Sequence, residues 1–213
     1  TARAFCAALG VEHIVLTTQE LASESFASNP PDRCYHCKKE LYDKLEALRV
    51  KRGADALLDG THAGDAGDYR PGLRAAREHG VRSPLREAGL GKDDVRALAR
   101  AWGVPAPDRP ANPCLASRIP YGTRITAAAL EQVAAGERAL RALGFADVRV
   151  RHHGPVARVE VAPADLPRLL DADLRKRVSQ ALHAAGFRWV ALDLDGYRMG
   201  SLNEALAGRE RAL

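Results

Sequence analysis

The sequence is poor in aromatic side chains, in sulfur and in long apolar runs. Phe, Trp and Tyr make up 5% of its 213 residues, and it contains four Cys and one Met. No apolar run approaches the roughly 20 residues that a membrane-spanning helix needs, and no cleavable signal pattern is present. These absences give no reason to expect a membrane protein or a secreted one. We expect a cytoplasmic protein whose thiols stay reduced.

Lysine is scarce as well, although the chain is basic. Six of the 32 basic residues are Lys, which leaves 26 Arg, and the formal net charge is +5. High Arg and Ala usage often follows from a GC-rich coding sequence, whereas Arg side chains also bind anionic groups such as phosphates. Composition does not decide between these explanations, so the positions of the arginines must.

Short apolar runs alternate with helical patterns in the first half of the chain. We expect strands at residues 11–16 and 54–60, with a helix between them that begins at Cys34 and ends at Gly53. Strands that alternate with helices are typical of an α/β unit with a parallel sheet. Such a sheet would need a first strand and a first loop before residue 1, so we expect the chain to be a fragment of that fold.

The pattern changes after a proline-rich stretch at residues 104–122. A capped helix from Thr126 to Gly144 is followed by two strands with a tight turn, further helices and a last strand, which indicates a small α+β domain. We therefore predict two domains, residues 1–120 and 121–213.

Three of the four cysteines could act together. Cys34 and Cys37 are one helical turn apart at the head of a predicted helix, so both sulfurs can reach one ion or one partner. This spacing fits a redox pair or half of a metal site. With Cys114, which lies in a proline-flanked loop, three thiolates would suit a cubane iron–sulfur cluster or a zinc ion. Three unrelated thiols are the alternative, and Cys6 is expected to pack in an apolar helix.

The loop at residues 59–72 follows an apolar run, which is where doubly wound folds bind their ligands. Asp59, Asp65 and Asp68 could hold Mg²⁺ or a nucleotide hydroxyl, and Arg70 could face a phosphate. The alternative is an acidic surface loop.

Arginines alternate with valines in the predicted hairpin. In the run 148–151 the valines take one face of the strand, and Arg149 and Arg151 take the other. Across the turn, Arg158 and Glu160 alternate with valines in the same way. Two arginines on one exposed face repel each other unless an anion or Glu160 lies between them, and a phosphate matches two guanidinium groups. A solvated face with local salt bridges is the alternative.

Three motifs, "RCYHCKKEL", "DGTHAGDAGDYRPG" and "PCLASRIPYG", together resemble the LarE family of ATP-dependent sacrificial sulfur transferases, which belongs to the PP-loop superfamily. The similarity continues through "RVRHHGPVARVEV" and "GYRMGSLNEAL" and so covers nearly the whole chain. It implies a PP-loop-type parallel sheet with flanking helices, truncated at the N-terminus, followed by the small α+β domain. We also expect a homo-oligomer.

The resemblance implies a reaction. ATP, with Mg²⁺, would adenylate a carboxylate of a pyridinium-dicarboxylate mononucleotide, and a sulfur nucleophile would displace AMP to leave a thiocarboxylate, a step in making the nickel-pincer nucleotide of lactate racemase. In one branch of the family a single cysteine, which matches Cys114, gives up its sulfur and becomes dehydroalanine. In another branch three cysteines hold a 4Fe–4S cluster whose extra sulfide is transferred. They match Cys34, Cys37 and Cys114, so the sequence favours this branch.

The resemblance also implies binding residues. Asp59, Asp65 and Arg70 would contact the nucleotide. The residues expected to bind the substrate phosphate are Ser117, Arg118, Arg149, Arg151 and Arg198.

The chain departs from the family pattern at two places. It has no Ser-Gly-Gly-x-Asp-Ser pyrophosphate loop, and without that loop the phosphates lose their cradle of backbone amides. We therefore expect the chain as given not to adenylate its substrate. His62 and Gly64 occupy positions where the family has Asn and Asp, so fewer nucleotide or Mg²⁺ contacts are expected from this loop.

Two other functions fit parts of the sequence. A PP-loop tRNA-thiolating enzyme can use a similar cysteine trio, and a non-catalytic zinc-stabilised module could bind nucleic acid through its arginines. The low aromatic content argues against a domain that grips RNA by stacking. We therefore expect a small nucleotide substrate rather than a nucleic acid.

Overall fold

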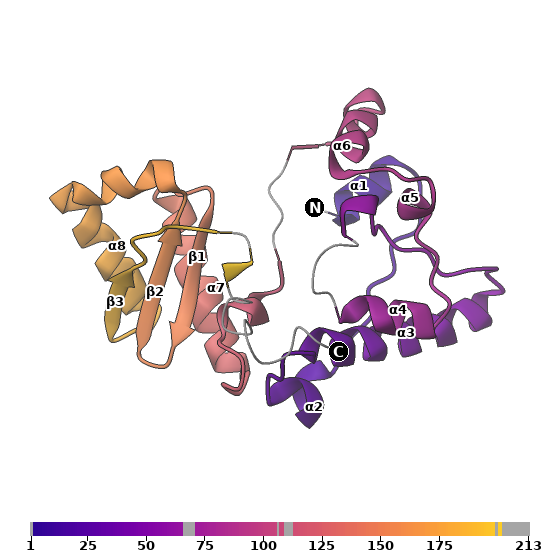
Figure 1. Ribbon diagram of the computed structural model, residues 1–213, viewed down its shortest axis with the longest axis horizontal. Coiled ribbons are helices and arrows are strands. Elements are labelled where there is room, and N and C mark those ends of the chain that lie inside the picture. Colours follow the sequence, from indigo (N-terminus) through magenta and orange to yellow (C-terminus); the bar gives the residue numbers. More distant parts are fainter. Residues whose placement is uncertain (1, 66–70, 106, 109–112, 199, 202–213) are drawn as a thin grey trace. The chain divides into compact units, whose positions relative to one another are not determined.

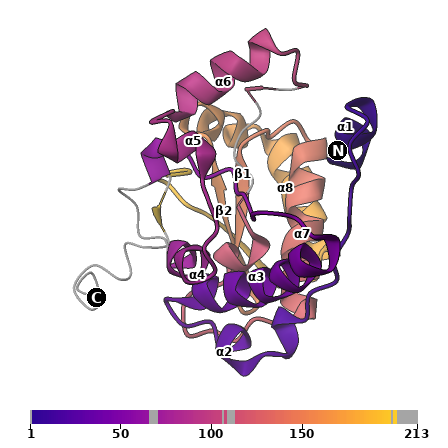
Figure 2. The same cartoon turned by 90° about the vertical axis from the view of Figure 1, so that its right-hand side faces the viewer.

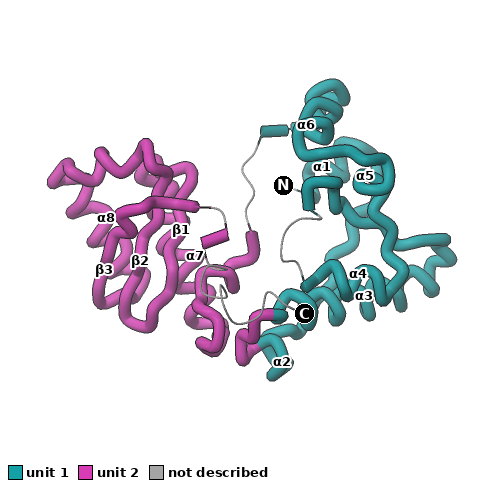
Figure 3. The backbone as a smooth tube through the Cα atoms, viewed as in Figure 1, with its two compact units in different colours: residues 1–26, 32–110 teal, residues 27–31, 111–213 magenta. Residues whose placement is uncertain are grey.

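The computed structural model describes residues 2–65, 71–105, 107–108, 113–198 and 200–201 (Figure 1). The chain divides into two compact units, one formed by Thr1–Phe26 and Asp32–Pro110 and the other by Ala27–Pro31 and Ala111–Leu213 (Figure 3). The described residues form a mixed α/β architecture, mostly helical, with a small three-stranded sheet. None of the helices in these residues combines the length and hydropathy that crossing a membrane would require.

The first unit is helical. Helix α3 (Arg33–Arg52) ends where the sequence predicts, because Gly53 adopts a left-handed conformation at φ 62° and its N–H bonds back to the carbonyls of Arg49 and Val50. The other elements that lie wholly in this unit are α1 (Ala2–Ala8), η1 (Glu20–Ala22), η2 (Ala63–Asp65), α4 (Gly72–Glu78), α5 (Pro84–Glu87) and α6 (Lys92–Ala101), while α2 (Glu24–Ala27) ends in the second unit.

Helices α3 and α4 pack side by side (Figure 1 and Figure 2). They enclose a small core built from Tyr42, Ala75, Ala76 and Val81. The approach is close because α4 begins with Gly72, where a Cβ atom would lie 3.0 Å from Cγ of a lysine on α3. The head of α3 is thereby fixed against α4.

The two strands predicted in the first half are not formed in the described residues. Residues 11–16 belong to no strand, and the run 54–60 contributes a single parallel bridge, between Leu58 and Arg82. A strand forms only when a ladder of hydrogen bonds joins it to a neighbouring strand. The described residues of this unit form one isolated bridge, which is too little for a strand. Val15 and Leu58 are accordingly exposed, at 66% and 62% of their surface.

The second unit is α+β, with the predicted helix, hairpin, helix and last strand. The antiparallel hairpin β1–β2 is joined by β3, which runs parallel to β2, so the strand order is β1-β2-β3. The elements of this unit are η3 (Leu115–Arg118), α7 (Ala127–Ala142), β1 (Val148–His153), β2 (Val156–Val161), η4 (Pro163–Leu170), α8 (Ala172–Ala184) and β3 (Trp189–Leu192).

The register of the hairpin separates an apolar face from a charged one. Val150 pairs with Val159 on the face covered by α7 and α8 (Figure 1 and Figure 2), whereas Arg149 pairs with Glu160 on the other face. The charged face was expected to be exposed, but Arg149 and Arg151 are 4% and 6% exposed. The difference arises because η3 packs on β1 and the chain after β3 bonds back to the end of β2.

Candidate active site

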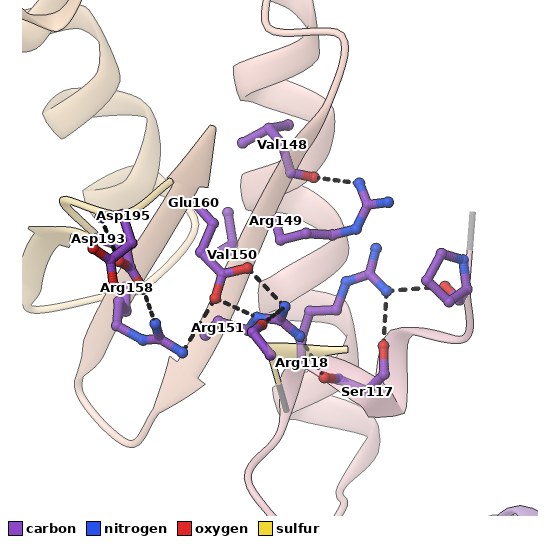
Figure 4. A network of polar contacts seen from close by, with 12 residues as sticks. Ser117, Arg118, Val148, Arg149, Val150, Arg151, Arg158, Glu160, Asp193 and Asp195 are labelled. Atoms are coloured by element: carbon purple, nitrogen blue, oxygen red, sulfur yellow. Dashed lines mark hydrogen bonds and ion pairs between the residues drawn. The ribbon is translucent and has the colours of Figure 1, made fainter. Parts of the chain in front are cut away.

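A chain of ion pairs crosses the charged face of the sheet in the second unit (Figure 4). Arg151 donates to both carboxylate oxygens of Glu160, at 2.9 and 2.6 Å, and Arg158 contacts the same carboxylate at 3.2 Å while pairing with Asp193. Glu160 is fully buried. It therefore supplies the counter-charge that lets two arginines share one face, since a buried charge must be paired.

A second buried ion pair joins η3 to α7. Arg118 donates from Nε to Oε1 of Glu137 at 2.7 Å and from Nη2 to Oε2 at 3.2 Å, and both side chains are at most 1% exposed. Burial raises the pKa of Glu137, but its bonds to Arg118 and Arg141 outweigh burial and hold that pKa below the ordinary value. Glu137 is thus a carboxylate held ionised inside the unit.

Sequence reasoning missed Glu137, although a signal was present. It stands between Val133 and Leu140 on α7, and all three residues are buried. An acidic residue within the apolar stripe of a helix is expected to be buried, and a buried carboxylate destabilises the fold unless it pairs with a cation. That pattern alone would have marked Glu137 as the partner of a buried cation.

Arg118 anchors the loop that carries Cys114. Nη1 of Arg118 donates to the carbonyls of Pro113 and Cys114, at 3.0 and 3.3 Å, and to Oγ of Ser117 at 2.9 Å. Oγ of Ser117 in turn donates to the Cys114 carbonyl at 2.7 Å. Cys114 itself is exposed and its thiol is free. The backbone is therefore anchored while the side chain remains exposed.

Asn29 holds the other end of the same loop and was also missed. Its side-chain amide donates to the carbonyls of Ile119, Pro120 and Thr123, at 3.3, 2.7 and 2.9 Å. It is fully buried and adopts φ 60°, a conformation that Asn tolerates better than most residues. An asparagine before two prolines was the only hint of this role.

Two further predicted phosphate ligands lie near this network. Arg149 donates to the Val148 carbonyl at 2.9 Å, and its guanidinium stacks over the ring of Tyr197 with 4.6 Å between the guanidinium carbon and the ring centre. Figure 4 shows Arg118, Arg149 and Arg151 on the same side of the sheet, beside η3. Arg198 pairs with Asp195 at 2.8 Å and is partly exposed.

Each buried carboxylate of this network serves two arginines. Arg118 and Arg141 share Glu137. Arg151 and Arg158 share Glu160, and Arg158 also pairs with Asp193. A set of guanidinium groups held close together in this way is chemically suited to an anion such as a phosphate.

Cys34 and Cys37 lie in the first turns of α3 in the first unit. Neither forms a disulfide, and Cys34 is exposed whereas Cys37 is half-buried. Tyr35 beside them stacks under the guanidinium of Arg74 at 3.8 Å, which pins α4 to this end of the helix. The structure thus brings two of the three predicted metal ligands onto one helix and places the third in the other unit. Within the described ranges, no group of three His, Cys, Asp or Glu side chains is gathered as a metal site.

The predicted nucleotide loop is held mainly by Asp59. Its Oδ1 accepts from Ser83 Oγ at 2.7 Å and its Oδ2 from Thr61 Oγ1 at 2.9 Å. Burial raises the pKa of Asp59, but these bonds outweigh it and hold the pKa low. Asp65 is buried and accepts from a backbone N–H at 3.0 Å. Asp68 and Arg70 lie outside the described residues.

No family model matches the chain, but known proteins do. An uncharacterized protein of Synechocystis sp. is 41% identical over 198 residues, 93% of this chain and 74% of that protein. The pyridinium-3,5-bisthiocarboxylic acid mononucleotide synthase of Lactiplantibacillus plantarum is 41% identical over 196 residues, 92% of this chain and 70% of the synthase. An uncharacterized protein of Methanocaldococcus jannaschii is 28% identical over 183 residues, 86% of this chain and 71% of that protein. The chain therefore belongs to the family of this synthase, the LarE family of ATP-dependent sulfur transferases.

Proposed function

We propose that the chain carries the sulfur-transfer step that converts an adenylated pyridinium carboxylate mononucleotide into a thiocarboxylate, in the biosynthesis of the nickel-pincer nucleotide. The observation that carries this proposal is the match to the Lactiplantibacillus plantarum synthase, 41% identical over 92% of the chain. The geometry supports it, because an exposed thiol at Cys114 stands on a loop anchored by a buried ion pair.

The arginine network would receive the phosphate of the substrate. A phosphate accepts charge-assisted hydrogen bonds from guanidinium groups, and several of these groups lie together on the charged face of the sheet (Figure 4). The five predicted ligands divide by their contacts. Arg118 and Arg151 each donate two N–H groups to a carboxylate. We therefore infer that they position neighbouring groups and do not bind the phosphate directly. Ser117, Arg149 and Arg198 would contact the phosphate itself.

Cys114 would act as the nucleophile when it is the sulfur donor. Its thiolate attacks the adenylated carboxyl carbon, a C–S bond forms, and AMP leaves with the electron pair of the C–O bond. Removal of the Cα proton then breaks the Cβ–S bond, which leaves a thiocarboxylate on the substrate and dehydroalanine at position 114. The anchored backbone keeps the thiol in place through both steps.

The donor that the sequence favours would be a 4Fe–4S cluster held by Cys34, Cys37 and Cys114. The donor set fits such a group, since none of the three cysteines is in a disulfide and two of them are exposed. When bound, the cluster would supply a sulfide for transfer. Cys34 and Cys37 would form a fixed pair on α3, and Cys114 would be the ligand nearest the substrate.

The remaining predictions belong to the same proposal. ATP and Mg²⁺ would be bound with the help of Asp59, Asp65 and Arg70. The hydrogen bonds of Asp59 support a role in shaping the loop. The first domain would serve adenylation, and the second would bind substrate in a cytoplasmic homo-oligomer. The tRNA-thiolating enzyme and the zinc-stabilised module draw no support from the relatives found.

The test is a cysteine panel in the full-length protein, purified without oxygen. If the cluster is the donor, Cys34→Ala, Cys37→Ala and Cys114→Ala each lose both the cluster absorbance and thiocarboxylate formation. If Cys114 is the donor, Cys34→Ala still forms product, and Cys114 of the wild type loses the elements of H₂S after turnover. Product formation in Cys114→Ala at the wild-type rate would refute the proposal, and Cys6→Ala is the matched control.

A further inference from the structure

A pocket of about 430 Å³ opens between α8 and the edge of the sheet in the second unit. Its size falls within the range of about 300–1,000 Å³ that small-molecule sites occupy. Neither the sulfur-transfer proposal nor the arginine network uses it. The pocket lies on the helix-covered face, because Leu192 of β3 pairs in register with Val159, whereas Arg149 and Arg151 lie on the opposite face.

The floor of the pocket is apolar. It is formed by Val159 of β2, Leu169 of η4, Val178 of α8, and Val190 and Leu192 of β3. The first three are buried, but Leu192 keeps 37% of its surface exposed. This exposure has a structural cause, since β3 is an edge strand and α8 leaves part of its inner face open.

The rim of the pocket is cationic. Arg175, Lys176 and Ser179 line it from α8, at the spacing of three and four residues that puts side chains on one face of a helix. Nη1 of Arg175 donates to the carbonyls of Leu169 and Leu170. In the described part of the chain, neither Arg175 nor Lys176 forms an ion pair with a carboxylate. The pocket lining therefore carries two positive charges that pair with no carboxylate among the described residues.

We propose that this pocket binds a small amphipathic organic anion, of the medium-chain or aryl carboxylate class. The apolar part of the ligand would lie on the valine and leucine floor, where burial removes it from water. Its carboxylate would meet Arg175, Lys176 and the hydroxyl of Ser179 at the rim. A small inorganic anion would leave the floor uncovered, and an uncharged chain would leave the two cations without a counter-charge.

The test uses the aryl sulfonate 1-anilinonaphthalene-8-sulfonate as a fluorescent probe on the full chain. The probe binds saturably, and octanoate and decanoate displace it. Decanoate does so about fifteenfold more tightly than octanoate, because it buries two more CH₂ groups and each contributes about a fourfold gain. Acetate does not compete, and decanol competes more weakly than decanoate. Equal competition by acetate, or by decanol and decanoate, would overturn the proposal.

Two variants locate the site. Ser179→Phe fills the pocket and abolishes probe binding, and Lys176→Glu weakens it about fivefold or more. Arg177→Glu, on the same helix but outside the lining residues, changes it less than about twofold and is the matched control. Lys176 is exposed, so its variant folds even if Ser179→Phe does not. Unchanged probe affinity in Lys176→Glu would show that the probe binds elsewhere and would refute the proposal.

Discussion

The guanidinium of Arg118 and the carboxylate of Glu137 form a two-point ion pair inside the second unit, with 2.7 Å from Nε to Oε1. Both side chains are at most 1% exposed to solvent. The same guanidinium bonds to the carbonyl of Cys114. This pair, buried between η3 and α7, thus holds the backbone of Cys114, whose thiol is exposed, and so links the stability of the fold to the placement of the sulfur.

Glu137→Ala should therefore destabilise the protein strongly. The substitution leaves the buried charge of Arg118 without its partner, and breaking such a pair typically costs about 3–5 kcal/mol. Urea unfolding measures the loss. The control is Glu131→Ala on the same helix, whose carboxylate is 71% exposed and pairs with Arg138. It should change stability by less than about 1 kcal/mol. Equal losses in the two variants would contradict this role of Glu137.

Asn29 should matter through both its amide and its backbone. Asn29→Gly keeps the φ of 60° without strain but loses three hydrogen bonds to the Cys114 loop, at about 1–3 kcal/mol. Asn29→Ala loses the same bonds and adds about 1–2 kcal/mol of left-handed strain. Thermal unfolding should rank the proteins as wild type, then Gly, then Ala. A Gly variant as stable as wild type would show that the amide bonds contribute nothing.

His79 should make stability depend on pH. Its Nε2 lies 2.8 Å from Asp43, its Nδ1 lies 2.8 Å from the Ala75 carbonyl, and these contacts raise its pKa above the ordinary 6.5. A raised pKa means that the charged form is favoured in the folded state. The stabilisation is therefore complete below pH 6.5 and is lost as the pH rises through the folded-state pKa.

The comparison of wild type with His79→Gln tests this dependence. The difference in unfolding free energy should be larger at pH 6 than at pH 9, by less than about 1 kcal/mol because Asp43 is half exposed. A difference that grows with rising pH would contradict the assignment.

Arg149 should hold the substrate phosphate. Arg149→Ala should weaken binding of the pyridinium mononucleotide by about 1.5–3 kcal/mol, the usual worth of hydrogen bonds to a charged group. Isothermal titration calorimetry measures the affinity. Arg138→Ala, an exposed arginine on α7, should leave it unchanged. Unaltered affinity in Arg149→Ala would return the residue to a purely structural role.

Local patterns predicted the second unit well. The stop at Gly144, the cap at Thr126 and the alternation through the hairpin all depend on neighbours in sequence, and the structure has them. The burial of Arg149 and Arg151 could not be predicted from alternation, since it depends on η3 packing over their face. Alternation says which face a side chain takes and not what covers that face.

Sheet formation in the first half could not be predicted in the same way. Residues 11–16 and 54–60 are apolar enough for strands, but a strand needs a hydrogen-bonded neighbour, and the described residues of that unit offer one bridge at Leu58. The site shows the same limit. Cys114 and the arginines are visible in the sequence, whereas Asn29 and Glu137 act through contacts 90 and 19 residues away.

The most direct test of sulfur transfer follows the sulfur atom itself. The full-length protein is produced with cysteine labelled by a heavy sulfur isotope and is given unlabelled ATP and the pyridinium dicarboxylate mononucleotide. We predict that mass spectrometry finds the labelled sulfur in the thiocarboxylate product of the wild type and of Cys6→Ala. No product should form in Cys114→Ala. Labelled product from Cys114→Ala, at the wild-type yield, would contradict the central role of this thiol.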